Sequence, residues 1–173
     1  MHKSLMGGGP RESGATSRFH FHPLGMRDAL AASRWRYPGR YAMYNLGLAP
    51  LIVAVFLRGP FSALAGVSYY AVTIEGEGLT GVFSLTRRGG DVEIGVGLRP
   101  DLNGRGLGLP YLLEGLALAR RRYHPRSFSL HVATFNQRAI TVYERAGFLP
   151  GRVTPFIYQG QRFEEMRMSR SAD

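Results

Sequence analysis

The chain has 173 residues, 45% of them hydrophobic and 20% charged, which predicts one folded domain and argues against a disordered chain. It contains no cysteine, so disulfides, thiolate metal sites and a cysteine nucleophile are excluded. Its formal net charge of +10 favours partners that carry phosphate or carboxylate groups.

The N-terminal part of the chain predicts a tail followed by a domain. Residues 1–17 are rich in Gly and Ser and lack the apolar core of a secretory signal, so we expect a flexible tail there and the folded domain over 18–173. The most apolar stretch, about 12 residues at 46–57, is interrupted by Pro50 and is too short for a bilayer span. We expect a cytoplasmic protein, and 46–57 stays open between core, lid and dimer surface.

Hydrophobic periodicity predicts the elements of the first half of the domain. Phe19, Phe21 and Leu24 suggest a short strand, and 26–35 a helix that ends before Pro38. Three strands of an antiparallel meander follow, at 69–74, 79–86 and 91–98.

The second half alternates helices with strands. We expect a helix over 109–123, a strand over 128–134, a helix over 137–146 that Gly147 ends, and a last strand over 163–168. This order is α+β, with a mixed central sheet of about six to seven strands flanked by helices. Its strand–helix–strand unit should be parallel with a right-handed crossover.

A glycine-rich loop at 100–108 joins a predicted strand to a predicted helix. Main-chain N–H groups at a helix N-terminus have no intrahelical partner, and glycines let an anion approach them closely. The loop has no Lys and therefore is no P-loop, and Gly104, Gly106 and Gly108 do not match the dinucleotide-binding pattern. A phosphate cradle and a plain tight turn remain equal alternatives from the loop alone.

Two segments together resemble the GCN5-related N-acetyltransferase (GNAT) superfamily. Residues 103–108, Asn-Gly-Arg-Gly-Leu-Gly, look like its pyrophosphate motif, with Asn103 where Gln or Arg is usual. Residues 136–148 resemble the second motif of the pair. Residues 35–44 and 93–100 are similar to a bacterial branch of the superfamily.

The resemblance implies that acetyl-CoA binds as acetyl donor, without a metal, where the fourth and fifth strands of the sheet splay apart. Unpaired main-chain groups on these strands would pair with the pantetheine amides. The glycines of the fourth strand mark either this approach or a bulge. The residues expected to bind acetyl-CoA are Val96, Gly97, Leu98, Asn103, Gly104, Arg105, Gly106, Leu107, Gly108, Asn136, Ala139 and Tyr143.

Three residues are candidates for catalysis by direct attack of an amine on the thioester. Tyr143 lies seven residues after Asn136, on the same helix face and about 10 Å along it, and is the expected acid for the departing thiolate. Glu93 and His131 are candidates for the base. The alternatives are a packing role for Tyr143, a solvated glutamate and a structural histidine. Main-chain N–H groups at 96–98 are expected to stabilise the oxyanion.

The aromatic segment at 35–44 is expected to line the acceptor pocket or to form a small core over a loop. Its arginines would oppose a polyamine and suit an amine or peptide that carries a carboxylate. The residues expected to bind the acceptor are Trp35, Tyr37, Tyr41 and Tyr44.

We therefore predict an N-acetyltransferase that acts on a primary amine of a small molecule or peptide. The alternative is a non-catalytic module that binds acyl-CoA or nucleic acid. We expect acetyl-CoA and an amine as partners and a second copy of the chain as a candidate, but neither membrane nor nucleic acid.

Overall fold

The computed structural model describes residues 18–47 and 66–173. The predicted tail at 1–17 and nearly all of the apolar stretch at 46–57 lie outside the described residues.

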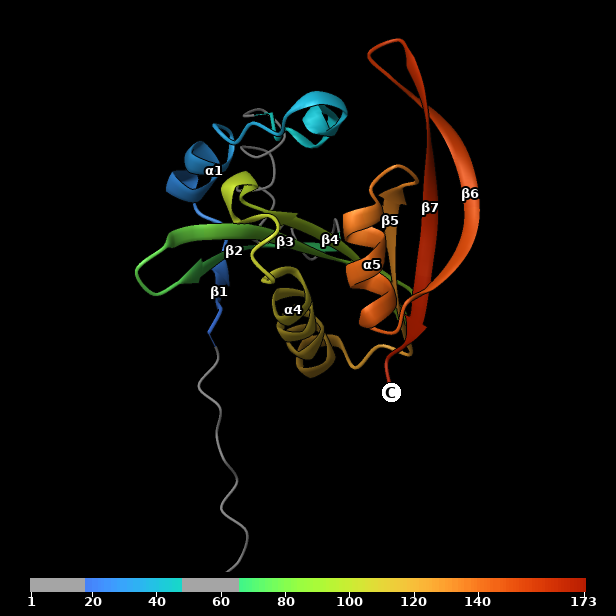
Figure 1. The fold of residues 1–173 in the computed structure, drawn as a ribbon. Coiled ribbons are helices and arrows are strands. Elements are labelled where there is room, and N and C mark those ends of the chain that lie inside the picture. The colour runs from blue at the N-terminus through green and yellow to red at the C-terminus, as the bar shows by residue number, and fades with distance from the viewer. Residues whose placement is uncertain (1–17, 48–65) are drawn as a thin grey trace, which may run out of the picture.

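A seven-stranded sheet in the order β1-β2-β3-β4-β5-β7-β6 organises the fold (Figure 1). All neighbours are antiparallel except β4 and β5, which are parallel. The strands are β1 His20–Pro23, β2 Val67–Ile74, β3 Gly78–Arg88, β4 Asp91–Leu98, β5 Ser127–Ala133, β6 Leu149–Tyr158 and β7 Gln161–Ser171. This confirms the predicted α+β class and mixed sheet.

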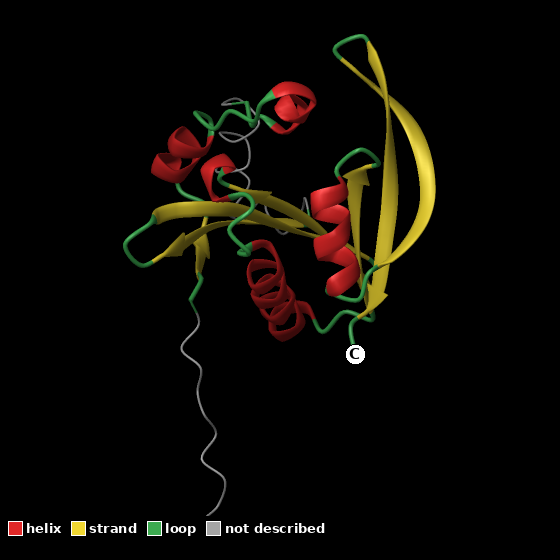
Figure 2. Ribbon diagram, in the orientation of Figure 1, coloured by secondary structure: helices red, strands yellow, loops and turns green. Residues whose placement is uncertain are grey.

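The helices cover both faces of the sheet (Figure 2). In the view of Figure 1, α1 and η1 lie above the β2–β4 half and α4 lies below it, while α5 lies between α4 and β5. The helical elements are α1 Met26–Ala32, the 3₁₀ turn η1 Gly39–Tyr44, the 3₁₀ turn η2 Pro100–Leu102, α4 Gly108–Tyr123 and α5 Gln137–Arg145.

Local sequence explains how the two long helices begin and end. Helix α4 ends because His124 takes a left-handed conformation, with φ of 46°. The Asn136 side chain accepts a hydrogen bond from the Ala139 N–H and so caps the start of α5. Gly147, with φ of 85°, follows the last turn of α5, as the sequence predicts.

Two hydrophobic cores lie on opposite faces of the sheet. The larger core packs α4 and α5 against β2–β5, with fully buried Phe83, Tyr111 and Phe128 among its large side chains. The smaller core packs α1 against Ala71 and Val82.

The parallel β4–β5 pair splays apart, as predicted for the fourth and fifth strands. Pairing is confined to Val92 with Phe128 and Glu93 with Ser129, whereas both strands continue several residues further. Facing edges of both strands are thereby left without ladder partners, and this opening lies beside the start of α4.

Three parts of the fold differ from the expectation. Helix α1 ends at Ala32, not at residue 35, and η1 was not predicted. The last strand is one arm of a long hairpin, because 149–158 forms β6. Pro150 and Pro155 concealed this strand; proline is tolerated there because β6 is the edge of the sheet.

Candidate active site

The loop between β4 and α4 has the shape and exposure that an anion cradle needs. Gly104 and Gly106 have φ of 80° and 74°, a region that favours glycine, and both are exposed with open space beside them. Helix α4 begins at Gly108, so the N–H groups of its first turn lack intrahelical partners. The Asn103 amide donates a hydrogen bond to the Pro100 carbonyl at 3.0 Å and steadies the turn.

Arg99 fixes this loop to the β2–β3 turn. Its guanidinium donates to Asp101 at 2.7 Å, to the Glu77 carboxylate at 3.2 Å and to the Glu77 carbonyl at 2.8 Å. The hydrogen bond to Asp101 is the largest cause that raises the pKa of Arg99, and it lowers the pKa of Asp101. Because its N–H groups are used in these hydrogen bonds, Arg99 holds the loop in place.

Two tyrosines bind the far ends of the splayed strands. The Tyr37 hydroxyl donates a hydrogen bond to the Leu98 carbonyl at 2.6 Å, and the Tyr44 hydroxyl accepts one from the Ala133 N–H at 3.2 Å. The two rings lie 6.4 Å apart. Burial raises the pKa of Tyr37 to about 12. The segment 37–44 thus spans the opening from β4 to β5.

Tyr143 lies on α5 and is buried, with 8% of its surface exposed. Burial raises the pKa of its hydroxyl above the ordinary 10.0, and the nearby hydroxyls of Tyr44 and Tyr37 raise it further. No described residue forms a hydrogen bond with this hydroxyl. A protonated phenol is therefore held close to the two tyrosines at the opening.

The two candidate bases lie on the face of the sheet opposite α4 and α5. Strand alternation places Glu93 on that face, and its carboxylate lies 3.6 Å from the guanidinium of Arg88. His131 is partly exposed on β5, and its Nδ1 lies 3.3 Å from the Glu165 carboxylate of β7. Sequence inspection found no carboxylate partner for His131, and the structure supplies Glu165.

An aromatic cluster covers the end of β5. We use this name for Tyr37, Tyr41, Tyr44, Phe135 and Phe163, whose rings are linked by contacts of 5.5–6.5 Å. The three tyrosines come from segment 37–44, Phe135 from the β5–α5 connection and Phe163 from β7. Three of the four residues expected to bind the acceptor are therefore brought together.

Trp35, the fourth of these residues, lies elsewhere. It is 7% exposed and packs in the smaller core with Leu24 and Ala29 of the α1 region. Within the described residues no ring contact joins it to the aromatic cluster.

The remaining residues expected to bind acetyl-CoA surround the loop and the opening. Val96, Gly97 and Leu98 lie beyond the part of β4 that pairs with β5 and are partly exposed. Arg105 is exposed, whereas Leu107 is buried at the α4 N-terminus. The start of α4 meets α5 closely, since a Cβ on Gly108 would lie 3.2 Å from Val142. Asn136 caps α5 and Ala139 lies in its first turn.

The residues present fit a molecule with a diphosphate followed by an extended amide chain. The exposed residues 104–106 and the N-terminus of α4 suit the diphosphate, and strand edges without ladder partners suit the amides. Among residues 18–47 and 66–173 there is no group of three or more His, Asp or Glu residues that could hold a metal ion. No helix in the part of the chain that the structure describes is long and apolar enough to span a bilayer.

A family model described as an acetyltransferase (GNAT) domain matches residues 32–149, more than half of the chain. The chain therefore belongs to the GNAT acetyltransferases, as the two motifs of the sequence indicate. The matched segment includes β2–β5, the glycine-rich loop, α4 and α5. The protein is an N-acetyltransferase by this membership.

Solved structures with the same fold include spermidine N-acetyltransferases from Vibrio cholerae. One is a chimera of this enzyme with hSSAT, with a TM-score of 0.75 and 17% identity over 90% of this chain and 96% of that one. A second is described as a complex with CoA and spermine, with a TM-score of 0.71 and 17% identity over 90% and 96% of the two chains. A third, also with a TM-score of 0.71 and 17% identity over 90% and 95%, is described as dodecameric. A search of curated proteins found no match.

Several residues at the site had no signal that sequence reasoning used. Phe135 stands alone between a predicted strand and helix, and Glu165 lies in an expected strand without a partner in sequence. Arg99 and Glu77 meet only through the fold. Their contacts are long-range, so a local pattern does not reveal them.

Proposed function

We propose that the protein transfers the acetyl group of acetyl-CoA to a primary amine of a small molecule or peptide by direct attack. The observation that carries this proposal is the parallel β4–β5 pair, which stops pairing after Glu93 and Ser129 beside the exposed loop at 104–106. A cradle for an anion and an opening for an extended chain thus adjoin each other.

In this proposal the loop and the opening hold the donor. N–H groups at 104–108 bind the diphosphate, assisted by Arg105 and by the positive end of α4. Main-chain groups of β4 at 96–98 and of β5 pair with the pantetheine amides. Asn136, which caps α5, and Ala139, in its first turn, contact the pantetheine from the other side.

The chemical step forms one bond and breaks one. The neutral amine nitrogen attacks the thioester carbon, a C–N bond forms, the C–S bond breaks, and the proton of the amine passes to a base. We assign the base to His131, since Glu165 binds Nδ1 and leaves the other ring nitrogen available. Glu93 is the alternative, but its charge is partly satisfied by Arg88.

Tyr143 is the proposed acid partner of the sulfur. Because burial raises its pKa, the phenol stays protonated at neutral pH and donates a hydrogen bond to the departing thiolate. An ordinary thiol has a pKa of about 8.5, below that of this phenol, so complete proton transfer from Tyr143 to the thiolate is uphill. The transfer is completed as the thiol leaves the site. Main-chain N–H groups at 96–98 stabilise the oxyanion. These steps need only side chains and main-chain groups of the protein.

The test is amine-dependent release of CoA thiol. The full chain is incubated with acetyl-CoA and a panel of primary amines, thiol is measured, and products are identified by mass spectrometry. We expect thiol release that equals acetylated amine. Binding of acetyl-CoA with only background hydrolysis over the whole panel would favour a non-catalytic acyl-CoA module. Nucleic acid binding with a steep salt dependence that CoA does not compete would favour the nucleic-acid alternative.

We further propose that the protein works in the cytoplasm and as a homodimer or larger assembly through the β6 edge. Leu149, Val153 and Ile157 of this edge strand are 70%, 45% and 68% exposed. An edge strand with exposed apolar side chains is a template for pairing with another chain. One solved structure with this fold is described as dodecameric.

A further inference from the structure

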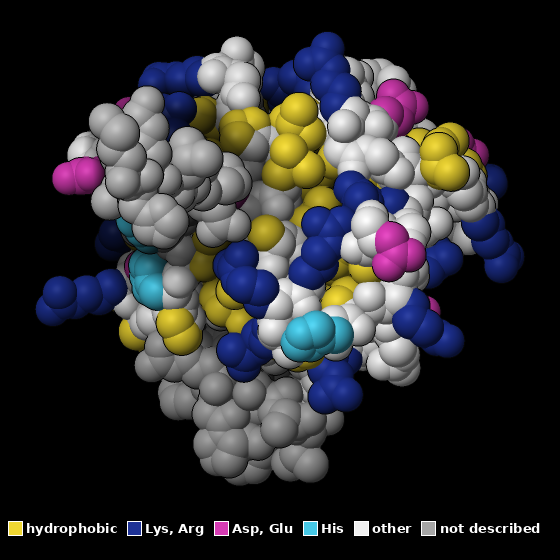
Figure 3. All heavy atoms as spheres, turned by 90° about the horizontal axis from the view of Figure 1, so that it is seen from below, with side chains coloured by type: hydrophobic (Ala, Val, Ile, Leu, Met, Phe, Trp, Pro, Cys, Tyr) yellow, Lys and Arg dark blue, Asp and Glu magenta, His cyan; other side chains and the backbone are white. Residues whose placement is uncertain are grey.

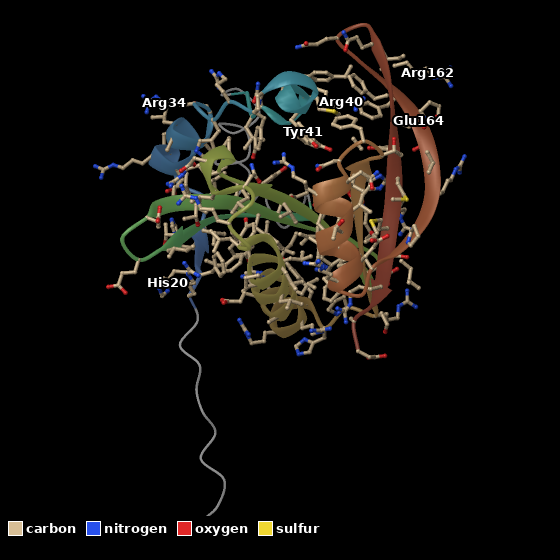
Figure 4. All side chains as sticks on the ribbon, viewed as in Figure 1. His20, Arg34, Arg40, Tyr41, Arg162 and Glu164 are labelled. Carbon is tan, nitrogen blue, oxygen red and sulfur yellow. The ribbon has the colours of Figure 1, made fainter. Side chains whose placement is uncertain are left out.

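Two arginines lie on the aromatic cluster at the opening between β4 and β5. The Arg40 guanidinium carbon lies 4.3 Å from the centre of the Phe135 ring, and that of Arg138 lies 4.6 Å from the centre of the Tyr41 ring. They come from η1 and from the first turn of α5. Figure 4 shows Arg40 and Tyr41 on η1, on the side that faces the β6–β7 hairpin.

The donors of these two arginines are not used by the described part of the chain. Neither guanidinium forms an ion pair or a hydrogen bond with a described residue, whereas Arg99 at the neighbouring loop binds two carboxylates. Stacking on a ring satisfies the flat face of a guanidinium and leaves its N–H groups pointing outward in the plane. Two preoriented cationic donors therefore border the opening.

The carboxylates nearby do not neutralise them. Glu165 pairs with His131, and Glu93 pairs with Arg88. Glu164 directly precedes Glu165 on β7, so strand alternation places it on the opposite face of that strand. A polycationic amine would meet like charge here, which disfavours its binding.

We propose that the acceptor is a primary amine that carries a carboxylate, and that Arg40 and Arg138 bind this carboxylate while the amine reaches the thioester. This inference rests on the proposed function and names its substrate class. A guanidinium fork matches a carboxylate in a bidentate manner, and such charge-assisted hydrogen bonds are about twice as strong as neutral ones. A ring of the aromatic cluster covers one side of each guanidinium.

The experiment compares matched acceptors on the full chain. The first pair is a dipeptide with a free C-terminal carboxylate and the same dipeptide with a C-terminal amide; spermidine is a third acceptor, and phosphoethanolamine with ethanolamine forms a second pair. Each is assayed with the wild type and with Arg40→Met and Arg138→Met, which keep an apolar side chain over the ring. Arg121→Met, an exposed arginine at the far end of α4, is the control for lost charge.

We expect the wild type to prefer the free carboxylate over the amide by about tenfold or more in kcat/KM. Each of the two test variants should raise the KM of the carboxylate acceptor by about tenfold and leave that of the amide nearly unchanged. The KM of acetyl-CoA should stay within about twofold in all variants, and Arg121→Met should match the wild type.

Different results would overturn different claims. Equal or better use of the amide or of spermidine, or preference for phosphoethanolamine, would overturn the carboxylate assignment while acetyl transfer stands. If Arg138→Met raised only the KM of acetyl-CoA, this arginine would bind acetyl-CoA, and the carboxylate assignment would also be overturned. No thiol release with any acceptor would contradict the proposed function itself.

Discussion

At the scale of single residues, the hydroxyl of Tyr143 is the group whose removal is most informative. It is buried and has no hydrogen-bond partner among the described residues, so its removal should not destabilise the fold. We expect Tyr143→Phe to lower kcat by roughly a hundredfold, with the KM of acetyl-CoA within about twofold. Steady-state kinetics together with a thermal melt measure this.

A matched control for this variant is Tyr111→Phe. Tyr111 is also buried, and its hydroxyl lies 3.4 Å from the Gly97 carbonyl. The Tyr111→Phe variant should keep most of the activity. Equal turnover of Tyr143→Phe and wild type would remove the acid role of Tyr143.

The raised pKa values of the tyrosines predict the alkaline side of the pH profile. An acid must be protonated to act, and a pKa raised above 10.0 keeps Tyr143 protonated past the range where an ordinary tyrosine ionises. Tyr37, with a pKa of about 12, likewise stays neutral. We expect kcat to stay level from about pH 8 to about pH 10. A fall of kcat between those values, measured with stable protein, would show that a group of ordinary or lowered pKa is the acid.

The two candidate bases are distinguished by isosteric replacements. His131→Gln removes the imidazole, and Glu93→Gln removes a carboxylate that already pairs with Arg88. If His131 is the base, its replacement should lower kcat by roughly a hundredfold and Glu93→Gln by only a few-fold. The reverse order, measured at saturating acetyl-CoA, would assign the base to Glu93.

At the scale of elements, the glycine-rich loop can be tested with two glycines of similar conformation. Gly106 has φ of 74° in the loop, and Gly160 has φ of 76° in the β6–β7 turn; both have open space beside them. Replacement by Ala should cost each about 1 kcal/mol through backbone strain. Only Gly106→Ala should raise the KM of acetyl-CoA, by roughly tenfold, since its Cβ enters the cradle.

Thermal or urea unfolding and acetyl-CoA kinetics on both variants make this comparison. If Gly160→Ala raised the KM of acetyl-CoA as much as Gly106→Ala, the effect would be one of stability and the cradle would lose its support.

Local signals made the framework of the fold predictable from sequence. Strand β4 has the predicted bounds because apolar side chains alternate along it, and α5 begins after Asn136 and ends before Gly147 as caps require. Strand β6 was not predicted because Pro150 and Pro155 argue against a strand. Proline is permitted in an edge strand, and the position of β6 at the edge is a property of the whole sheet.

The surroundings of the site were less predictable, because they depend on distant pairs. The sequence predicted that aromatic residues of segment 35–44 bind the acceptor, and the tyrosines among them do gather at the opening. Nothing in the local sequence distinguishes them from Trp35, which packs in a core. The contact of Tyr44 with Ala133 joins residues far apart in sequence. Pairing of this kind follows only from the folded sheet.

At the scale of the whole molecule, charge and an open sheet edge are the features that bear on partners. Figure 3 shows Arg side chains over much of the face seen from below, with fewer acidic ones. With a net charge of +10, the molecule attracts polyanions such as the phosphates of CoA over a distance set by ionic strength. The other feature is β6, which ends the sheet.

The exposed β6 edge leads us to expect self-association of the protein, which one added charge on this strand should weaken. Ile157→Lys places a charge among exposed apolar side chains, and lysine on an edge strand opposes pairing. We expect light scattering after size exclusion to show a dimer or larger assembly for the wild type and a smaller species for the variant. His20→Lys, on the opposite edge strand β1, should behave as the wild type. A monomeric wild type at tens of micromolar would contradict the assembly.

The most direct test of the central claim is a crystal structure of the full chain with CoA. We predict diphosphate oxygens within about 3 Å of main-chain N–H groups at 104–108, with the pantetheine between β4 and β5. The sulfur should lie beside the Tyr143 hydroxyl. CoA bound at another surface, or a diphosphate held by side chains away from this loop, would contradict the account.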